Sequence, residues 1–117
     1  MNLVLIFIVK YFYIANNTML SKNHILSFLV ANKNYLLANF NVSKIGIFGS
    51  YATGKQNEKS DLDLIVEFLD GTENLYEIKQ KLRDYIGTNL NIKVDICREK
   101  FIKNIFKDKI INNAEYI

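Results

Sequence analysis

The sequence predicts an α/β (α+β) fold in which a small β-sheet is packed by helices. Three features predict this fold: short apolar or alternating segments suited to strands, longer segments with apolar residues every three to four positions, and glycine-containing turns between them. At 117 residues the chain fits one domain that can bury a core, and it is too short for a second, substrate-binding domain.

The first half of the chain predicts a helix, a buried strand and a tight turn. Ser21 is a suitable N-cap for a helix that runs to about Asn39. Residues 44–48 predict a short buried strand, and Gly49 and Ser50 follow where that strand turns into a short helix. A helix N-terminus there would offer backbone N–H groups to a phosphate. The apolar stripe of the first helix comprises Ile25, Leu26, Phe28, Leu29, Leu36 and Leu37.

Residues 61–68 alternate between polar and apolar side chains, which predicts a strand with one buried face. Asp61 and Asp63 therefore point together, away from the core. Carboxylates two residues apart on a strand are roughly 6–7 Å from each other, a spacing at which a hard divalent cation can bind to both. The predicted outer face holds Asp61, Asp63, Ile65 and Glu67, and the predicted inner face holds Leu62, Leu64, Val66 and Phe68.

The second half predicts a helix, a strand and a helical tail. Thr72 is the predicted cap of a helix that runs to about Ile86 and ends at Gly87. In the predicted strand 91–97, Asp95 points away from the apolar face, so it can supply a third carboxylate from a strand about 4.8 Å from its neighbour. The helical tail contains Phe101, Ile102, Ile105, Phe106, Ile110 and Ile111.

The Gly49-Ser50 pair, ten intervening residues, the Asp61-x-Asp63 pair and the later Asp95 resemble the signature of the polymerase-beta-like nucleotidyltransferase superfamily. The short length and the closing run 109–117 resemble its minimal nucleotidyltransferase group. The resemblance covers about residues 20–117 and implies the polymerase-beta-like nucleotidyltransferase fold, with a mixed rather than an all-parallel sheet.

The resemblance also implies roles for these residues. Gly49 and Ser50 would bind the nucleotide, and Asp61 and Asp63 would bind Mg²⁺. Asp95 would contribute to a second Mg²⁺ and assist the incoming hydroxyl. All three aspartates are thereby candidate catalytic and metal-binding residues.

The reaction implied is transfer of a nucleoside monophosphate, AMP from ATP, to an acceptor hydroxyl. In the minimal group the acceptor is a tyrosine of a HEPN toxin, and the nucleotidyltransferase acts as the antitoxin of a type VII toxin–antitoxin system. Many relatives carry Arg or Lys where Thr53 stands, and Lys55 and Lys59 are nearby substitutes for that charge. Two alternatives stay open: a non-catalytic nucleotide-binding antitoxin that acts by occlusion, and a nucleotidyltransferase that modifies a small molecule or an RNA end.

Composition excludes or disfavours several other classes. The net charge of +3 is mild and the lysines are spread along the chain, so a nucleic-acid-binding surface is not favoured. The single cysteine, Cys97, excludes an intramolecular disulfide and fits a cytoplasmic protein. No Cys/His cluster has the spacing of a zinc site. The apolar run 3–9 is shorter than the ~20 residues that a membrane span needs.

Residues 1–18 differ from the rest of the chain and are expected to be an N-terminal extension outside the minimal nucleotidyltransferase domain, residues 19–117. They lack helix caps and charge patterning, and Met19 stands two residues before the predicted cap Ser21. The alternatives are a partner-binding hydrophobic segment and a membrane anchor.

A chain that begins at Met19 should therefore be as stable and as active as the full chain, and more soluble, because an exposed run such as 3–9 promotes aggregation. Urea denaturation of both chains checks this. A loss of more than about 2 kcal/mol, the scale of one or two buried aliphatic side chains, would show that the segment is part of the core. The core expected without it contains Ile25, Leu29, Ile47, Leu64 and Val94.

Overall fold

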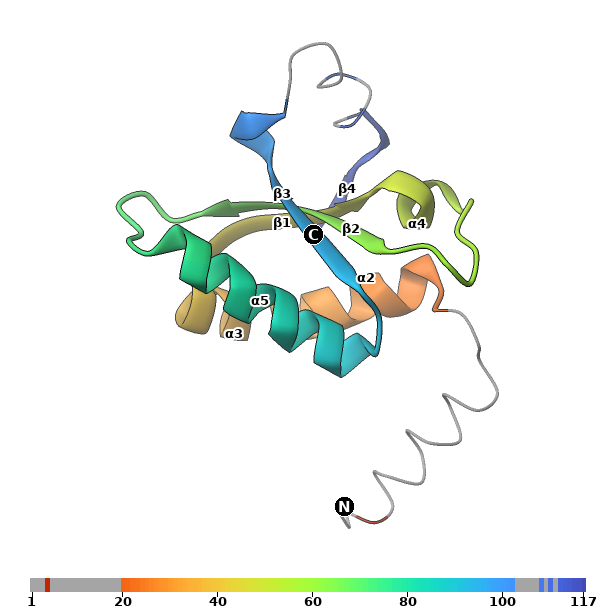
Figure 1. Ribbon diagram of the computed structural model, residues 1–117, viewed down its shortest axis with the longest axis horizontal. Coiled ribbons are helices and arrows are strands. Elements are labelled where there is room, and N and C mark those ends of the chain that lie inside the picture. The colour runs from red at the N-terminus through yellow and green to blue at the C-terminus, as the bar shows by residue number, and fades with distance from the viewer. Residues whose placement is uncertain (1–3, 5–19, 103–107, 109, 111) are drawn as a thin grey trace.

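A four-stranded sheet with the strand order β3-β2-β1-β4 forms the centre of the protein, as the computed structural model shows (Figure 1). The structure describes residues 4, 20–102, 108, 110 and 112–117. Strand β1 is antiparallel to β2 and to β4, whereas β2 and β3 are parallel, so the expected mixed sheet is confirmed. The strands are β1 (Val42–Phe48), β2 (Leu62–Phe68), β3 (Val94–Arg98) and β4 (Glu115–Tyr116).

Three helices cover one face of this sheet: α2 (Lys22–Ala31), α3 (Lys33–Phe40) and α5 (Leu75–Leu90) (Figure 1). The short helix α4 (Gly49–Thr53) follows directly on β1, and a 3₁₀ turn, η1 (Glu99–Phe101), follows β3. Because α5 connects the parallel strands β2 and β3, it is the crossover helix of a β-α-β unit and packs beside β3. No helix in the described part of the chain is long and apolar enough to cross a bilayer.

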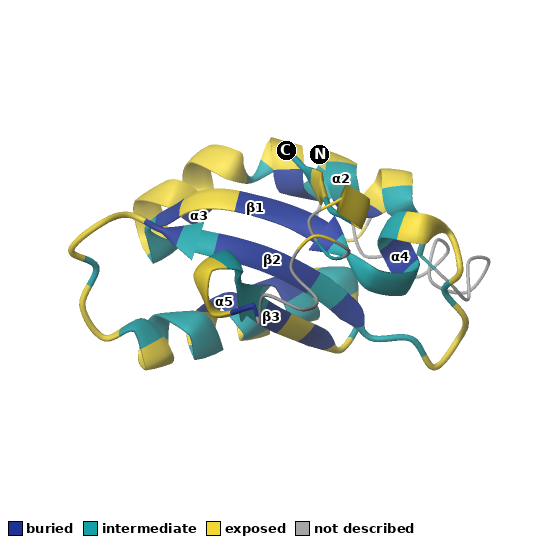
Figure 2. Ribbon diagram, turned by 90° about the horizontal axis from the view of Figure 1, so that it is seen from above, coloured by how far each residue is buried: buried dark blue, intermediate teal, exposed yellow. Residues whose placement is uncertain are grey.

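The core lies between the sheet and these helices, as the alternation of the strands predicts. Figure 2 shows buried residues along the middle of β1 and β2 and exposed residues on the outer surfaces of the helices. Ile65 lies on the opposite face of β2 and is nevertheless fully buried, because it sits in the central strand between Gly46 and Cys97. The five residues expected in the core, Ile25, Leu29, Ile47, Leu64 and Val94, are all buried.

The single helix expected from Ser21 to Asn39 is wrong, because the chain breaks at Asn32 into α2 and α3. The Asn32 amide donates a hydrogen bond to the Phe28 carbonyl (2.8 Å), which competes with regular helix bonding. The Asn32 side-chain oxygen accepts one from the Tyr85 hydroxyl of α5 (2.8 Å), which fixes the break. The predicted N-cap is confirmed, since the Ser21 hydroxyl accepts from the backbone N–H of His24.

Both predicted ends of α5 are wrong. The Thr72 hydroxyl donates to the Leu69 carbonyl (2.6 Å) within the preceding turn, so Thr72 does not cap the helix, and Asn74 precedes its first residue. Gly87 lies inside α5, which ends at Leu90, and the following residue, Asn91, is the cap in the left-handed conformation. Asparagine tolerates that conformation because its short polar side chain bonds locally. Since Asn91 is left-handed, the strand expected over 91–97 begins only at Val94 and extends to Arg98.

The expected helical tail is replaced at its start by η1 and an extended Ile102. The tail positions Ile105, Phe106 and Ile111 lie outside the described residues, as do residues 1–18 apart from Val4. Strand β4 was not predicted. It pairs with β1 at Gly46 and Ile47, and a Cβ on Gly46 would lie 2.7 Å from the Glu115 carbonyl oxygen, so the absence of a side chain permits this pairing.

Gly46→Ala should therefore destabilise the fold by about 1–3 kcal/mol, the usual range for overpacking a tight site. Urea denaturation measures the change. Ser43→Ala, an exposed position on the same strand, is the control and should change stability by less than about 0.5 kcal/mol. An unchanged midpoint in Gly46→Ala would show that the contact of β4 with β1 contributes nothing to stability.

Candidate active site

The turn after β1 brings the backbone of Gly49 against the side chain of Asp63. Gly49 has a φ of +71°, a left-handed conformation that favours glycine. A Cβ on Gly49 would also lie 2.5 Å from Asp63 Oδ2, closer than side chains tolerate. Two independent constraints therefore select glycine here, and one of them is the approach of the predicted catalytic carboxylate.

The register of β2 and β3 brings two of the predicted aspartates together. Asp63 is paired directly with Asp95 across the parallel strands, on the face of the sheet opposite the core. In-register residues of neighbouring strands are separated by about 4.8 Å at the backbone. Asp61 lies one residue before β2, at the same end of the sheet. The structure thus brings Asp63 against Gly49 and beside Asp95, and it places Asp61 at the same end of the sheet.

The electrostatics of this cluster are unfavourable for three ionised carboxylates. Burial raises the pKa of Asp63, and the negative charges of Asp95 and then Asp61 raise it further. A group whose charged form is destabilised in this way attracts a compensating cation. Lys93 provides weak compensation, since its ammonium is 3.9 Å from Asp61 Oδ2 and its side chain is 83% exposed.

The donor set fits a hard divalent cation such as Mg²⁺, which prefers carboxylate oxygens. Asp63 and Asp95 face the same space, and the raised pKa of Asp63 marks a local excess of negative charge. Within the described residues, no three His, Cys, Asp or Glu side chains converge as a formed metal cage. The Asp61 carboxylate lies on the side of Lys93, 3.9 Å from its ammonium.

Helix α4 positions the other predicted residues. Ser50 lies in its first turn and is partly buried, and Tyr51 is buried against the core. The Thr53 hydroxyl lies near the carbonyl oxygens of Gly49 (3.3 Å) and Ser50 (3.4 Å), to which it donates, so it reinforces α4 and supplies no charge. Lys55 is exposed in the loop that follows, as is Lys59.

A groove of about 580 Å³ opens beside two of the carboxylates, Asp61 and Asp95. Its other wall belongs to α5, and sequence reasoning missed that contribution. The available signal was the four-residue spacing of Arg83 with Gly87 and of Asp84 with Thr88, which places these pairs on one side of the helix. The crossover position of α5 then brings that side to β3. The remaining lining residues are Ile92, Lys93 and Val94.

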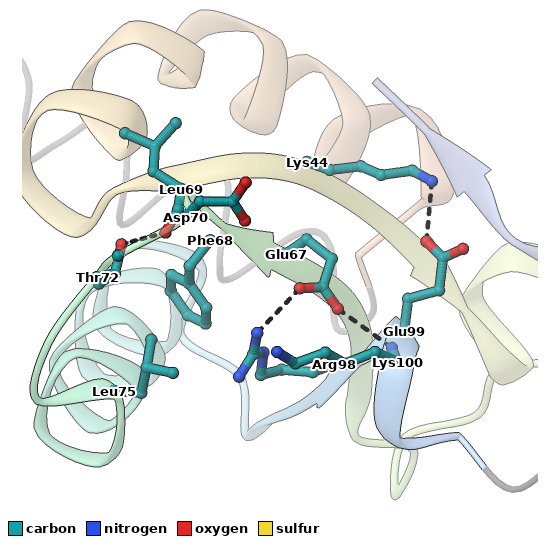
Figure 3. Close-up of a pocket in the computed structure, with 11 residues that line it drawn as sticks. Lys44, Glu67, Phe68, Leu69, Asp70, Thr72, Leu75, Arg98, Glu99 and Lys100 are labelled. Carbon is teal, nitrogen blue, oxygen red and sulfur yellow. Dashed lines mark hydrogen bonds and ion pairs between the residues drawn. The ribbon is translucent and has the colours of Figure 1, made fainter.

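A second cavity, of about 490 Å³, lies at the opposite end of the sheet (Figure 3). Two of its three cations are paired with carboxylates: Arg98 with Glu67 at 3.1 Å and Lys44 with Glu99 at 2.8 Å. The Glu67 carboxylate also accepts from the backbone N–H of Lys100 (3.2 Å), which fixes η1 to β2. These contacts give the second cavity a structural role, so the candidate active site is the end of the sheet that holds the three aspartates.

The chain resembles nucleotidyltransferases over most of its length. Residues 32–117 match the family model described as polymerase beta, nucleotidyltransferase. The chain is 32% identical over 99 residues to protein adenylyltransferase MntA of Thermococcus cleftensis, covering 85% of this chain and 98% of that protein. It is 41% identical over 80 residues to a provisionally named protein adenylyltransferase of Methanocaldococcus jannaschii, covering 68% of this chain and 80% of the relative.

Two solved structures share its fold. One, provisionally assigned as a minimal nucleotidyltransferase, has a TM-score of 0.70 at 24% identity and covers 85% of this chain and 98% of that one. The other is a toxin–antitoxin crystal structure with AMP-PNP, which has a TM-score of 0.52 at 25% identity and covers 83% of this chain and 72% of that one.

The raised pKa of Asp63 predicts how stability depends on pH in the absence of divalent cations. Above the pKa that Asp63 has in the folded protein, its ionised carboxylate lowers the free energy of unfolding. This loss of stability disappears as the pH falls through that pKa towards the ordinary value of about 3.9. Asp63→Asn should therefore melt at a higher temperature than the wild type at pH 7 in EDTA, and the difference should vanish at low pH. Asp70→Asn, at an exposed position, is the matched control. A lower melting temperature for Asp63→Asn at pH 7 would contradict the electrostatic account.

Proposed function

Because the chain belongs to the polymerase-beta nucleotidyltransferase family, we propose that it transfers AMP from ATP to a tyrosine hydroxyl of a HEPN-domain toxin in the cytoplasm, in a Mg²⁺-dependent reaction. It would thereby act as the antitoxin of a type VII toxin–antitoxin system. The similarity to protein adenylyltransferase MntA supports the adenylyl group. The likeness to a toxin–antitoxin structure with AMP-PNP supports ATP as the donor and a toxin as the partner.

The observation that carries the proposal is the arrangement of Asp63 against Gly49 and in register with Asp95. A nucleotidyl transfer site needs a phosphate-binding turn next to carboxylates on neighbouring strands. In this role Ser50 and the backbone amides after Gly49 would bind the β- and γ-phosphates. The close approach of Asp63 to that turn would place the α-phosphorus beside the carboxylates.

Asp61, Asp63 and Asp95 would hold Mg²⁺. When bound, Mg²⁺ supplies neutralisation of the triphosphate charge and lowers the pKa of the acceptor hydroxyl. Asp95, on the edge strand β3 and exposed, would accept the hydrogen bond of that hydroxyl and orient it. The bond from the acceptor oxygen to the α-phosphorus would form as the bond to pyrophosphate breaks. The hydroxyl proton would pass to Asp95 and from there to solvent, and pyrophosphate would leave.

A second candidate function is a nucleotide-binding antitoxin that acts by occlusion without turnover. The contacts of Thr53 favour it, because this side chain is directed back to helix carbonyls and carries no charge towards the phosphates. Lys55 and Lys59 would have to supply that charge from an exposed loop.

The two candidates differ in what Asp61→Asn/Asp63→Asn does. As an enzyme, this variant should lose AMP transfer from α-labelled ATP to a co-expressed HEPN partner by at least about 100-fold, the scale of removing one electrostatic stabiliser from a transition state. It should still co-purify with that partner, because amide side chains leave the fold and its surfaces in place. Scintillation counting of the partner band measures transfer.

Asp70→Asn/Glu73→Gln removes two exposed carboxylates at the other end of β2 and serves as the control. It should transfer AMP at the wild-type rate. Full neutralisation of the toxin in cells by Asp61→Asn/Asp63→Asn would instead favour the occluding antitoxin.

A further inference from the structure

The parts of the candidate site lie in a fixed order across the sheet. Gly49 follows β1, Asp63 lies in β2, and Asp95 lies in the edge strand β3. The groove lined by Asp61, Asp95 and α5 lies beyond, on the β3 side. The phosphate-binding turn and the groove are therefore on opposite sides of the carboxylates.

This order separates the two reacting partners. In phosphoryl and nucleotidyl transfer the leaving and attacking oxygens are roughly in line, on opposite sides of the phosphorus. If pyrophosphate leaves from the Gly49 and Ser50 side, the acceptor hydroxyl must approach from the side of β3. The groove is the space that the structure provides there, and Asp95 lines it.

The groove suits an extended protein segment better than a bare hydroxyl. Its volume of about 580 Å³ leaves room for residues on either side of an acceptor side chain. Ile92 and the edge of the mostly buried Val94 contribute apolar atoms to its lining, and Gly87 leaves space beside them because it has no side chain. Polar groups from α5 line the opposite wall, at positions 83, 84 and 88.

The charges of the groove indicate what flanks the acceptor. Arg83 is partly buried and donates to the Gln80 side-chain oxygen (2.6 Å). Among the residues that the structure describes, no carboxylate lies within ion-pair distance of its guanidinium. A guanidinium with free donors recognises carboxylates through paired hydrogen bonds. Lys93 is directed to Asp61, at 3.9 Å, so Arg83 is the cation of the groove whose remaining donors are available to a carboxylate of a bound segment.

We propose that this groove binds a protein segment in which acidic residues flank the acceptor tyrosine, and that Arg83 is the residue that selects the acidic flank. The identity of the acceptor rests on the proposed function. The groove and the position of Arg83 in its wall do not rest on that function.

The test measures binding and needs no catalysis. Two fluorescein-labelled octapeptides have a central tyrosine, which is flanked by glutamates in one peptide and by lysines in the other. Each is titrated with the full chain in the presence of Mg²⁺ and a non-hydrolysable ATP analogue, and fluorescence anisotropy gives the Kd. The glutamate peptide should bind about tenfold more tightly, as expected for one charge-assisted pair. Arg83→Glu should abolish this preference, and Arg83→Gln, which keeps a polar side chain of similar length, should reduce it.

Lys81→Glu is the matched control, because it makes the same charge change on the same helix outside the groove, at an exposed residue paired with Glu77 (3.0 Å). It should keep the preference. The proposal is overturned if Arg83→Glu and Lys81→Glu show the same preference between the two peptides. It is also overturned if ATP with Mg²⁺ no longer stabilises Arg83→Glu, because that result would place the nucleotide in the groove. Peptide binding without any AMP transfer would count against the proposed function and leave the groove assignment intact.

Discussion

Repulsion among Asp61, Asp63 and Asp95 is the constraint on which the account of this protein depends. The parallel register of β2 and β3 places Asp63 beside Asp95, and burial together with their charges raises the pKa of Asp63. A fold does not gain stability from such a cluster unless something positive occupies it. Lys93, largely exposed and 3.9 Å from Asp61, compensates little. This unfavourable cluster is the basis of the proposal that the site binds a divalent cation together with a triphosphate.

The rest of the structure holds this cluster in place. The core packs α2, α3 and α5 under the sheet and fixes the directions in which the strands point their side chains. The left-handed turn at Gly49 brings the backbone against the Asp63 side chain. The ion pairs at the far end of the sheet, Arg98 with Glu67 and Lys44 with Glu99, join η1 and the strands where no chemistry is proposed.

The parts that the sequence predicted well are those determined by local pattern. The alternation over 61–68 identified the buried face of β2. The Gly49-Ser50 and Asp61-x-Asp63 spacing identified a turn and a strand end that the structure brings together, while the roles of these residues remain a prediction. The failures depend on distant contacts. The break at Asn32 depends on the Tyr85 hydroxyl of α5, and β4 depends on the absence of a side chain at Gly46. The groove was not predicted because Arg83 and Asp95 line the same groove only after α5 crosses over to β3.

The central claim is that the carboxylates bind a cation and a nucleotide together. Its most direct test is to measure the melting temperatures of the wild type and of Asp63→Asn with ATP, both with and without Mg²⁺. A ligand that binds only the native state raises the free energy of unfolding by mass action, by about 2.7 kcal/mol at one hundred times its Kd. The account predicts that ATP raises the melting temperature of the wild type only when Mg²⁺ is present, and that Asp63→Asn shows no such rise. Equal stabilisation of both proteins by ATP, or stabilisation of the wild type that does not depend on Mg²⁺, would contradict it.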